Sequence, residues 1–342
     1  MRSIKIDGPF YAILDNAAEQ AKLMSDAGYD GVYTLEGNTD PFLPLLLANE
    51  HAPNLDISTA IAVAFPRNPA HLAYQAWDLQ KFSKGKFFLG LGSQIKPHIE
   101  KRFGCDFSPP APRMREHILA VKAFFNTFQN DARLDYEGKY YRHTLMTPMF
   151  NAGPCEYGPP PIMLGAVGPR MTQVAGEVAD GLIVHPFHTK AFLDEAQLPI
   201  IETALETSGR QRDDFIMSVS AMVVTGNNEQ EYEAAKTSLK GLLGFYGSTP
   251  AYIPPMAAVG LDHLQPELNK MSKEGAWDKL GDIVDDEFLN AFAVCGEPHT
   301  IAQQLIDKYG DIADRLSIYA PYQTTPDVWP GIIAEMKQLL GR

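Results

Sequence analysis

The feature that most constrains the fold is an alternation of short apolar stretches with helical patterns along nearly the whole chain. The stretch 86–91 follows the turn signal Ser83-Lys84-Gly85 and is apolar on both faces, as expected of a buried parallel strand. Comparable stretches predict strands at 3–6, 30–35, 56–64, 86–91, 162–164, 180–184, 215–224 and 315–319. Helical spacing follows them at 14–27, 41–50, 70–82, 113–128, 170–178, 199–208, 229–243, 300–308 and 328–340. The alternation predicts an α/β fold, a (β/α)8 TIM barrel spanning residues 1–342 as a single domain.

Three regions interrupt this alternation, near 97–112, 130–160 and 245–290. Residues 103–112 are rich in Pro and Gly, which predicts a long loop over the barrel mouth. Residues 134–141 predict a small hairpin that turns at Gly138. Residues 245–255 are dense in aromatics and prolines, so we expect an irregular lid there. The inserted loops and helices should lie over the C-terminal mouth of the barrel.

Composition excludes several classes of function. The 342 residues carry a net charge of −13, and no cluster of Lys and Arg suggests a nucleic-acid partner. The chain shows neither a secretory leader nor an apolar run long enough for a membrane span, so we expect a cytoplasmic protein that does not bind membranes. Its three cysteines lie far apart without a CxxC motif, which argues against a disulfide framework or a cysteine-rich metal site.

The strand at 86–91 ends in a stretch suited to binding a ligand. Gly90 and Gly92 lack side chains, as required where the backbone turns or a ligand approaches closely. In parallel α/β folds, ligands bind at the carboxyl ends of the strands. The polar side chains just past this strand end are Ser93, Gln94, Lys96 and His98.

Polar groups also follow two other predicted strands. Glu36 and Asn38 come after the second strand, where a barrel enzyme places acid/base or orienting groups, although residues 38–40 also suit helix capping before Pro41. His185 and His188 follow the strand at 180–184. A metal site needs a third ligand nearby and no HxH or HExxH motif exists, so a hydrogen bond to cofactor or substrate is favoured, with no metal.

A glycine-rich turn precedes the helix at 170–178. Gly165, Ala166, Val167 and Gly168, followed by Pro169, suit a phosphate site at a helix N-terminus, and equally a turn that binds nothing. Neither a P-loop nor a Rossmann motif is present, and Ser93 lacks the GxSxG context of a nucleophile. Tyr246 and Tyr252, and also Tyr140 and Tyr141, are candidates to line a substrate pocket, although Tyr140 and Tyr141 also suit packing within the hairpin.

Taken in order, several short motifs resemble the successive signatures of the bacterial luciferase-like superfamily. They are Ser58-Thr59-Ala60-Ile61 with Asn68-Pro69, the run 83–92, Gly138-Lys139-Tyr140-Tyr141, Gly165-Ala166-Val167-Gly168-Pro169, Ala179-Asp180-Gly181 and Gly296-Glu297-Pro298. The resemblance covers nearly the whole chain and implies a (β/α)8 barrel, usually dimeric, that binds FMN or the deazaflavin coenzyme F420. With GLGSQIKPHIEKRFG and FYGSTPAY included, the pattern looks most like the F420-dependent oxidoreductase branch.

The resemblance also implies roles for individual residues. It implies a non-prolyl cis peptide at Ala60-Ile61, against one face of the cofactor ring, with Ser93 and His98 near the cofactor. The sugar-phosphate dehydrogenases of this family carry a His after strand two and a Glu after strand four, whereas the matching positions here are Asn38 and Ile95. A sugar-phosphate substrate is therefore not indicated.

These observations predict an F420-dependent oxidoreductase that transfers hydride to or from an organic small molecule. The residues expected to hold the cofactor are Ala60, Ile61, Ser93, Gln94, His98, Gly165, Ala166, Val167, Gly168 and Pro169. Asn38, Glu36 and His185 are the candidate catalytic residues, and Tyr246 and Tyr252 the candidate substrate contacts. The alternatives are an FMN-dependent two-component monooxygenase and a non-catalytic flavin- or deazaflavin-binding barrel, and for each we expect a homodimer.

Overall fold

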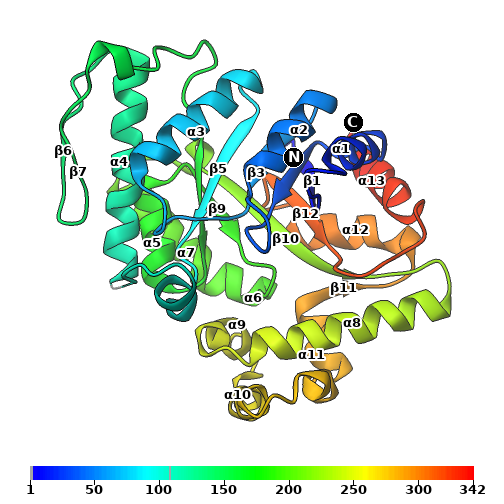
Figure 1. The fold of residues 1–342 in the computed structure, drawn as a ribbon. Coiled ribbons are helices and arrows are strands. Elements are labelled where there is room, and N and C mark those ends of the chain that lie inside the picture. Colours follow the sequence, from blue (N-terminus) through cyan, green and yellow to red (C-terminus); the bar gives the residue numbers. More distant parts are fainter. Residues whose placement is uncertain (1–2, 108) are drawn as a thin grey trace.

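The computed structural model describes residues 3–107 and 109–342. Its centre is a closed barrel of parallel strands, which confirms the predicted (β/α)8 fold (Figure 1). The main sheet has ten strands; β4 continues β3, β11 pairs with the end of β10, and pairing of β9 with β10 closes the ring. The strands of this sheet are β1 (Lys5–Pro9), β2 (Gly31–Thr34), β3 (Asp56–Thr59), β4 (Ala62–Val63), β5 (Phe87–Gly92), β8 (Ile162–Ala166), β9 (Gly181–Val184), β10 (Ile216–Val224), β11 (Ala293–Cys295) and β12 (Arg315–Tyr319).

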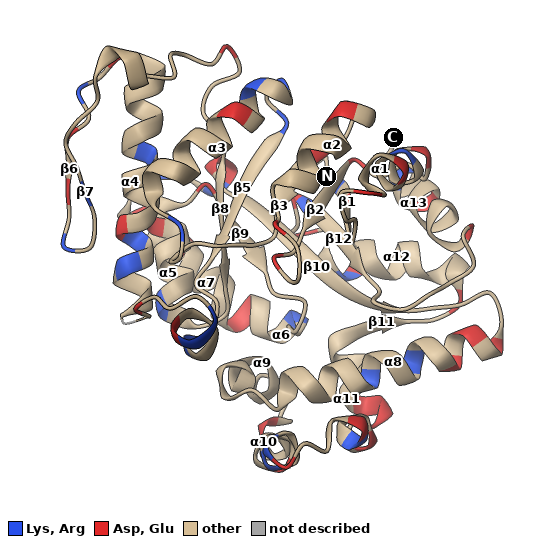
Figure 2. Ribbon diagram, in the orientation of Figure 1, with Lys and Arg blue, Asp and Glu red and all other residues tan. Residues whose placement is uncertain are grey.

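Helices surround the barrel, and several begin with a proline whose fixed φ suits the first helical position. They are α1 (Ala17–Asp26), α2 (Leu43–His51), α3 (Pro69–Phe82), α4 (Pro110–Asn130), α5 (Pro169–Val178), α6 (Lys190–Phe192), α7 (Leu198–Thr207), α8 (Glu229–Gly247), α9 (Ile253–Ala257), α10 (Gln265–Lys273), α11 (Asp286–Phe292), α12 (Pro298–Tyr309) and α13 (Val328–Leu339). Acidic and basic residues are interspersed over these outer helices (Figure 2). Within the described ranges, each helix is too short or too polar to span a membrane.

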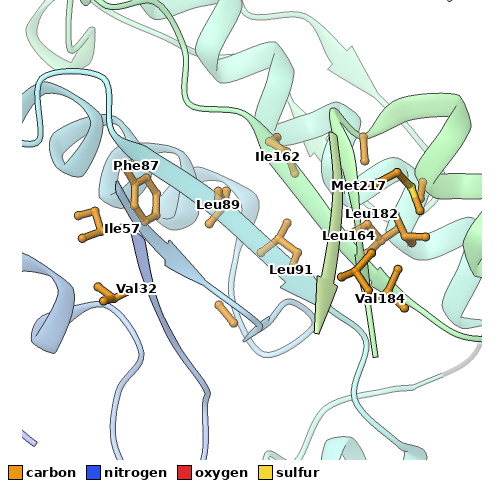
Figure 3. Packing of buried hydrophobic residues seen from close by; sticks show 14 of the residues in the cluster. Val32, Ile57, Phe87, Leu89, Leu91, Ile162, Leu164, Leu182, Val184 and Met217 are labelled. Atoms are coloured by element: carbon orange, nitrogen blue, oxygen red, sulfur yellow. The ribbon is translucent and has the colours of Figure 1, made fainter. Parts of the chain in front are cut away.

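The period-two alternation of side chains along a strand separates the helix-facing core from the barrel interior. On β5, Phe87, Leu89 and Leu91 are fully buried in the main hydrophobic core. Figure 3 shows them along the strand, with core residues of β8 and β9 nearby. The intervening positions, Phe88, Gly90 and Gly92, therefore face the interior. Because two of these three residues are glycines, the strand contributes little side-chain volume to the upper barrel.

An ion cluster closes the bottom of the barrel interior. Arg315 donates to both carboxylate oxygens of Asp7, at 2.6 and 2.7 Å, and to Asp56 at 2.9 Å. Its guanidinium also lies 4.8 Å from the centre of the Phe88 ring. A buried charge is tolerated when it is paired and hydrogen-bonded, as it is here. The open space of the barrel consequently lies above this cluster, towards the carboxyl ends of the strands.

The third strand is interrupted, whereas the sequence predicts one continuous strand over 56–64. The strand stops at Thr59, the Ala60–Ile61 peptide is cis, and pairing resumes in β4. The cis bond agrees with the expectation drawn from the family resemblance. Thr59 compensates for the interruption, because its Oγ1 donates to the Gly90 carbonyl at 2.7 Å and accepts from the Gly90 N–H at 3.0 Å.

The prediction that residues 245–255 are irregular was wrong. Helix α8 continues through Gly247, a 3-10 turn covers Pro250–Tyr252, and α9 follows directly. The helix persists because it packs on a second hydrophobic cluster that includes Leu243 and Phe288. Gly244 is needed there, since a Cβ at this position would lie 2.5 Å from the Leu280 carbonyl oxygen. The predicted lid is thus a helical layer, α8 to α11, which lies next to the barrel mouth and is drawn at the lower edge of Figure 1.

The insertion at 130–160 packs on the outside of the barrel. Its hairpin strands are β6 (Tyr136–Glu137) and β7 (Arg142–His143), with the predicted turn at Gly138. Figure 1 places the hairpin beside α4. Tyr141, a candidate pocket residue, instead contacts Arg113 and His117 of α4 through its hydroxyl. Tyr140 is anchored on the same helix through its backbone N–H, which donates to Glu116 at 2.7 Å.

Candidate functional site

A cavity of about 490 Å³ opens at the carboxyl ends of the barrel strands. Its walls come from the ends of β2, β5, β8 and β9, from residues 93–96 and Phe107 of the loop after β5, and from Ala251 and Tyr252 of the helical layer. The size is typical of a site for a small molecule or cofactor, and the lining is mainly apolar with a few polar groups. A cavity in this position is expected of a barrel enzyme.

Glycines create the space that the interrupted third strand occupies. A Cβ at Gly92 would lie 2.7 Å from the side chain of Ile61, and a Cβ at Gly165 would lie 3.1 Å from it. Ile61 therefore sits between β5 and β8, and the Ala60–Ile61 segment forms one wall of the cavity. From the sequence, these glycines suit either a ligand or a backbone turn. The structure fills the space with the neighbouring strand.

Glu36 holds the segment that follows the cis peptide. Its carboxylate accepts the Val63 N–H at 2.6 Å and pairs with Arg67 at 2.6 Å, while only 7% of the side chain is exposed. Arg67 also donates to the Val63 carbonyl at 2.9 Å. With one oxygen engaged twice, Glu36 is arranged to fix the cavity wall. Its placement suits a positioning role better than proton transfer.

The glycine-rich turn leads into α5 at another edge of the cavity. Ala166, Val167 and Gly168 line the cavity, and Gly168 is the N-cap of α5 with no side-chain cap bond. Pro169 has no N–H, and the Met171 and Thr172 N–H groups donate to the Gly168 carbonyl, so this end offers an anion the Arg170 N–H and the positive end of the helix dipole. Gln197 fixes the turn, because its buried amide donates to the Ala166 carbonyl at 3.0 Å.

The opposite side of the cavity carries an imidazole and several phenols. His185 Nδ1 accepts the Phe187 N–H at 3.1 Å, and His185 Nε2 lies 3.1 Å from the Tyr252 hydroxyl. Burial lowers the pKa of His185 to about 3, with a smaller contribution from His188, so the imidazole is neutral at physiological pH. Burial also raises the pKa of Tyr252 to about 12. Tyr246 packs edge-on against the same imidazole, with ring centres 5.0 Å apart.

The structure brings most of the predicted site residues together. Those that line the cavity are Glu36, Ala60, Ile61, Ser93, Gln94, Gly165, Ala166, Val167, Gly168, His185, Tyr246 and Tyr252. Asn38, His98 and Pro169 lie outside the lining: Asn38 is exposed on the loop after β2, and His98 is exposed at the start of the π-helix η1 (His98–Arg102). The described residues contain no group of three potential metal ligands.

Sequence reasoning missed several residues of the lining. Tyr33, Ser220 and Tyr319 reach the cavity from β2, β10 and β12. Their positions follow from the period-two rule once the inward face of each strand is known, so a signal for them existed. Phe107 and Met171 come from a loop and from a helix start, where no such periodicity applies. Only the tertiary arrangement reveals them.

Comparison with known proteins agrees with this architecture. Residues 7–315 match the family model described as luciferase-like monooxygenase. An uncharacterised protein of Mycobacterium tuberculosis is 45% identical over 315 residues, which covers 92% of this chain and 93% of the relative.

Two examples illustrate the solved structures that share the fold. The coenzyme F420-dependent tetrahydromethanopterin reductase from Methanopyrus kandleri superposes with a TM-score of 0.80 at 20% identity, covering 99% of both chains. The oxygenating constituent of 3,6-diketocamphane monooxygenase of Pseudomonas putida, in complex with FMN, gives a TM-score of 0.66 at 17% identity, covering 100% of this chain and 99% of that one. With its barrel, its cavity and a family match over most of its length, the chain belongs to the luciferase-like monooxygenase family.

Proposed function

We propose that this protein is an F420-dependent oxidoreductase that transfers hydride between the deazaflavin coenzyme and a fairly apolar organic substrate. The observation that carries the proposal is the cavity with an apolar wall at Ala60–Ile61 and the N-terminus of α5 on its rim. A flat tricyclic ring suits the first feature and a phosphate suits the second. The higher TM-score with an F420-dependent reductase, 0.80 against 0.66 with an FMN-bound monooxygenase, supports F420.

The residues present fit such a cofactor. Ala60 and Ile61 would contact the ring, Ser93 and Gln94 would hydrogen-bond near it, and the turn from Gly165 to Gly168 would hold the phosphate. When bound, F420 supplies or accepts a hydride through a ring carbon. The chain itself would orient the substrate and exclude water, with Phe107 and the helical layer over the barrel mouth as the covering groups.

The FMN-bound structural neighbour makes an FMN-dependent monooxygenase the second candidate. Titration of the purified protein with F420 and with FMN, followed by quenching of cofactor fluorescence, separates the two. We expect saturable F420 binding and little response to FMN. Micromolar or tighter binding of FMN without an F420 response would contradict the proposal and favour the monooxygenase.

A charge substitution tests the phosphate position. Gly168→Glu places a carboxylate on the turn without a steric conflict, because the space around a Cβ there is free to 4 Å. Repulsion between like charges should raise the dissociation constant for F420 by about tenfold or more. Gly331→Glu is the matched control, since its Cβ on the outer helix α13 is equally free. Equal affinities for both variants would remove the α5 turn from the cofactor site.

A further inference from the structure

His185 and Tyr252 form a hydrogen-bonded pair across the cavity wall. His185 follows β9 of the barrel, whereas Tyr252 ends the 3-10 turn between α8 and α9. The rings are stacked, with centres 4.7 Å apart and planes inclined by 26°, and the hydroxyl lies 3.1 Å from Nε2. Both residues line the cavity, so the pair faces the space available to a substrate.

The hydrogens of this pair can be assigned from its other contacts. The Phe187 backbone N–H, 3.1 Å from His185 Nδ1, can only donate, so Nδ1 carries no hydrogen. Since the imidazole is neutral, its single hydrogen is on Nε2 and is donated to the Tyr252 hydroxyl oxygen. Among the described residues, no second hydrogen-bond partner faces that hydroxyl. The hydrogen of Tyr252 therefore remains for a group inside the cavity.

Unlike Tyr252, the other phenols of the cavity lining have hydroxyl groups that face another protein hydroxyl. The hydroxyl groups of Tyr246 and Tyr319 face each other at 3.4 Å, and Tyr33 bonds to Ser317 at 2.8 Å. Tyr252 instead receives a ring N–H on its oxygen, which stabilises the phenolate formed when its proton leaves. The arrangement is that of a proton donor with a fixed support, as general acid catalysis requires.

We propose that Tyr252, supported by His185, protonates the carbonyl oxygen of the substrate, so that the cavity reduces ketones or aldehydes. This inference rests on the proposed function, because a reduced deazaflavin supplies the hydride. The hydride forms a C–H bond at the carbonyl carbon, the C=O π electrons move to oxygen, and the Tyr252 proton completes the hydroxyl group. The two electrons of the hydride would come from a bound reduced deazaflavin, and the tyrosinate regains a proton from solvent after the product leaves.

The protonation states of His185 and Tyr252 favour reduction of a carbonyl over oxidation of an alcohol. Burial disfavours both the imidazolium and the phenolate, so the resting pair has a proton to give and no base ready to accept one. Reduction of a carbonyl uses that proton directly. Oxidation of an alcohol requires the pair to lose a proton first. We therefore expect reduction to be the faster direction near neutral pH.

Tyr252→Phe tests the assignment, since it removes the hydroxyl group and keeps the stacked ring. The probe is cyclohexanone, added to protein that carries oxidised F420 and cannot turn over. We expect the dissociation constant of cyclohexanone to rise by about five- to tenfold in Tyr252→Phe. The infrared carbonyl stretch of bound cyclohexanone should move to higher frequency as its hydrogen bond is lost. With reduced F420, single-turnover reduction should slow by about 100-fold or more.

Tyr232→Phe is the control, because this phenol on α8 is half-buried outside the cavity lining. His185→Gln is the second variant, because its amide N–H can still support Tyr252. We expect the logarithm of the cyclohexanone dissociation constant to rise by less than half as much as in Tyr252→Phe. Unchanged cyclohexanone affinity and carbonyl frequency in Tyr252→Phe would overturn the role of Tyr252. Absence of cyclohexanone binding to F420-loaded wild-type protein would overturn the carbonyl class. Absence of F420 binding would overturn the proposed function itself.

Discussion

Replacing Gly90 by alanine is expected to prevent the barrel from folding normally. The Cβ atom would lie 1.7 Å from the Thr59 carbonyl oxygen and 2.7 Å from Ile183 Cδ1. Ile183 can move, but Thr59 is held on both sides: it pairs with Thr34 of β2, and its hydroxyl bonds to Gly90 twice. Relief therefore requires the separation of two central strands. We expect a loss of about 4 kcal/mol or more in the free energy of unfolding.

Urea unfolding monitored by circular dichroism measures this loss, together with the yield of folded protein. Gly241→Ala is the matched control, because a Cβ at that position on α8 has free space to 4 Å. A glycine-to-alanine change in a helix should leave stability unchanged or raise it by up to about 1 kcal/mol. A wild-type urea midpoint in Gly90→Ala would mean that β3 and β5 can part freely, contrary to the contacts described above.

Gly90 also illustrates how far the sequence predicts the fold. The alternation of apolar strands and helices sufficed for the barrel because each unit repeats the same burial pattern, inward and outward, at a fixed period. The same pattern predicts that the glycine-containing end of β5 lies at the cavity, as Gly92 does. It did not reveal that Thr59 and Ile61 fill the space next to the glycines. Contacts between residues about thirty positions apart leave no local signature.

The candidate site was predictable where it lies at strand ends, and less so in the loops. His185 follows β9 directly and lines the cavity as expected. Glu36 and Asn38 are two positions apart in one loop, yet Glu36 turns inward to Val63 and Arg67 while Asn38 is exposed. Partners on β4 and on the loop that follows it decide this difference. The prediction for residues 245–255, which include Tyr252, is wrong for a related reason: tertiary packing of α8 overrides the local content of aromatics and prolines.

The neutral state of His185 has a consequence beyond the site, since two other histidines, His117 and His188, are also deeply buried. His117 lies on α4 against the hairpin, and His188 lies next to α12 against Tyr309. Burial, with the positive charge of Arg113 adding to it, lowers the pKa of His117 to about 3. Burial lowers that of His188 to about 4, with Lys308 adding to the effect, against hydrogen bonds that act to raise it. All three are uncharged in the folded protein near neutral pH.

Folding stability should therefore fall steeply in mild acid. In the unfolded chain a histidine has its ordinary pKa of about 6.5, so below that pH the unfolded state binds protons that the folded state rejects. The stabilising contribution of neutral histidines is complete above pH 6.5 and is lost as the pH falls towards 3 to 4. With three such groups, the slope approaches about 4 kcal/mol per pH unit around pH 5. These three groups would remove about 6 kcal/mol of stability by pH 5 and about 10 kcal/mol by pH 4, which lies within the typical stability of about 5 to 15 kcal/mol.

Urea unfolding at a series of pH values from neutral to pH 4.5 gives this slope directly. Replacing one buried histidine, as in His117→Gln, removes one of the three titrating groups, so we expect the slope to fall by about one third whatever the variant does to stability at pH 7. His263→Gln is the control, because its side chain is exposed on the helical layer and its replacement should leave the slope as in the wild type. A slope in His117→Gln equal to that of the control would mean that His117 is protonated in the folded protein. In that case, the hairpin must open enough to hydrate the imidazole, and the packing of Tyr141 on α4 would be looser than its 3.0 Å contact with His117 indicates.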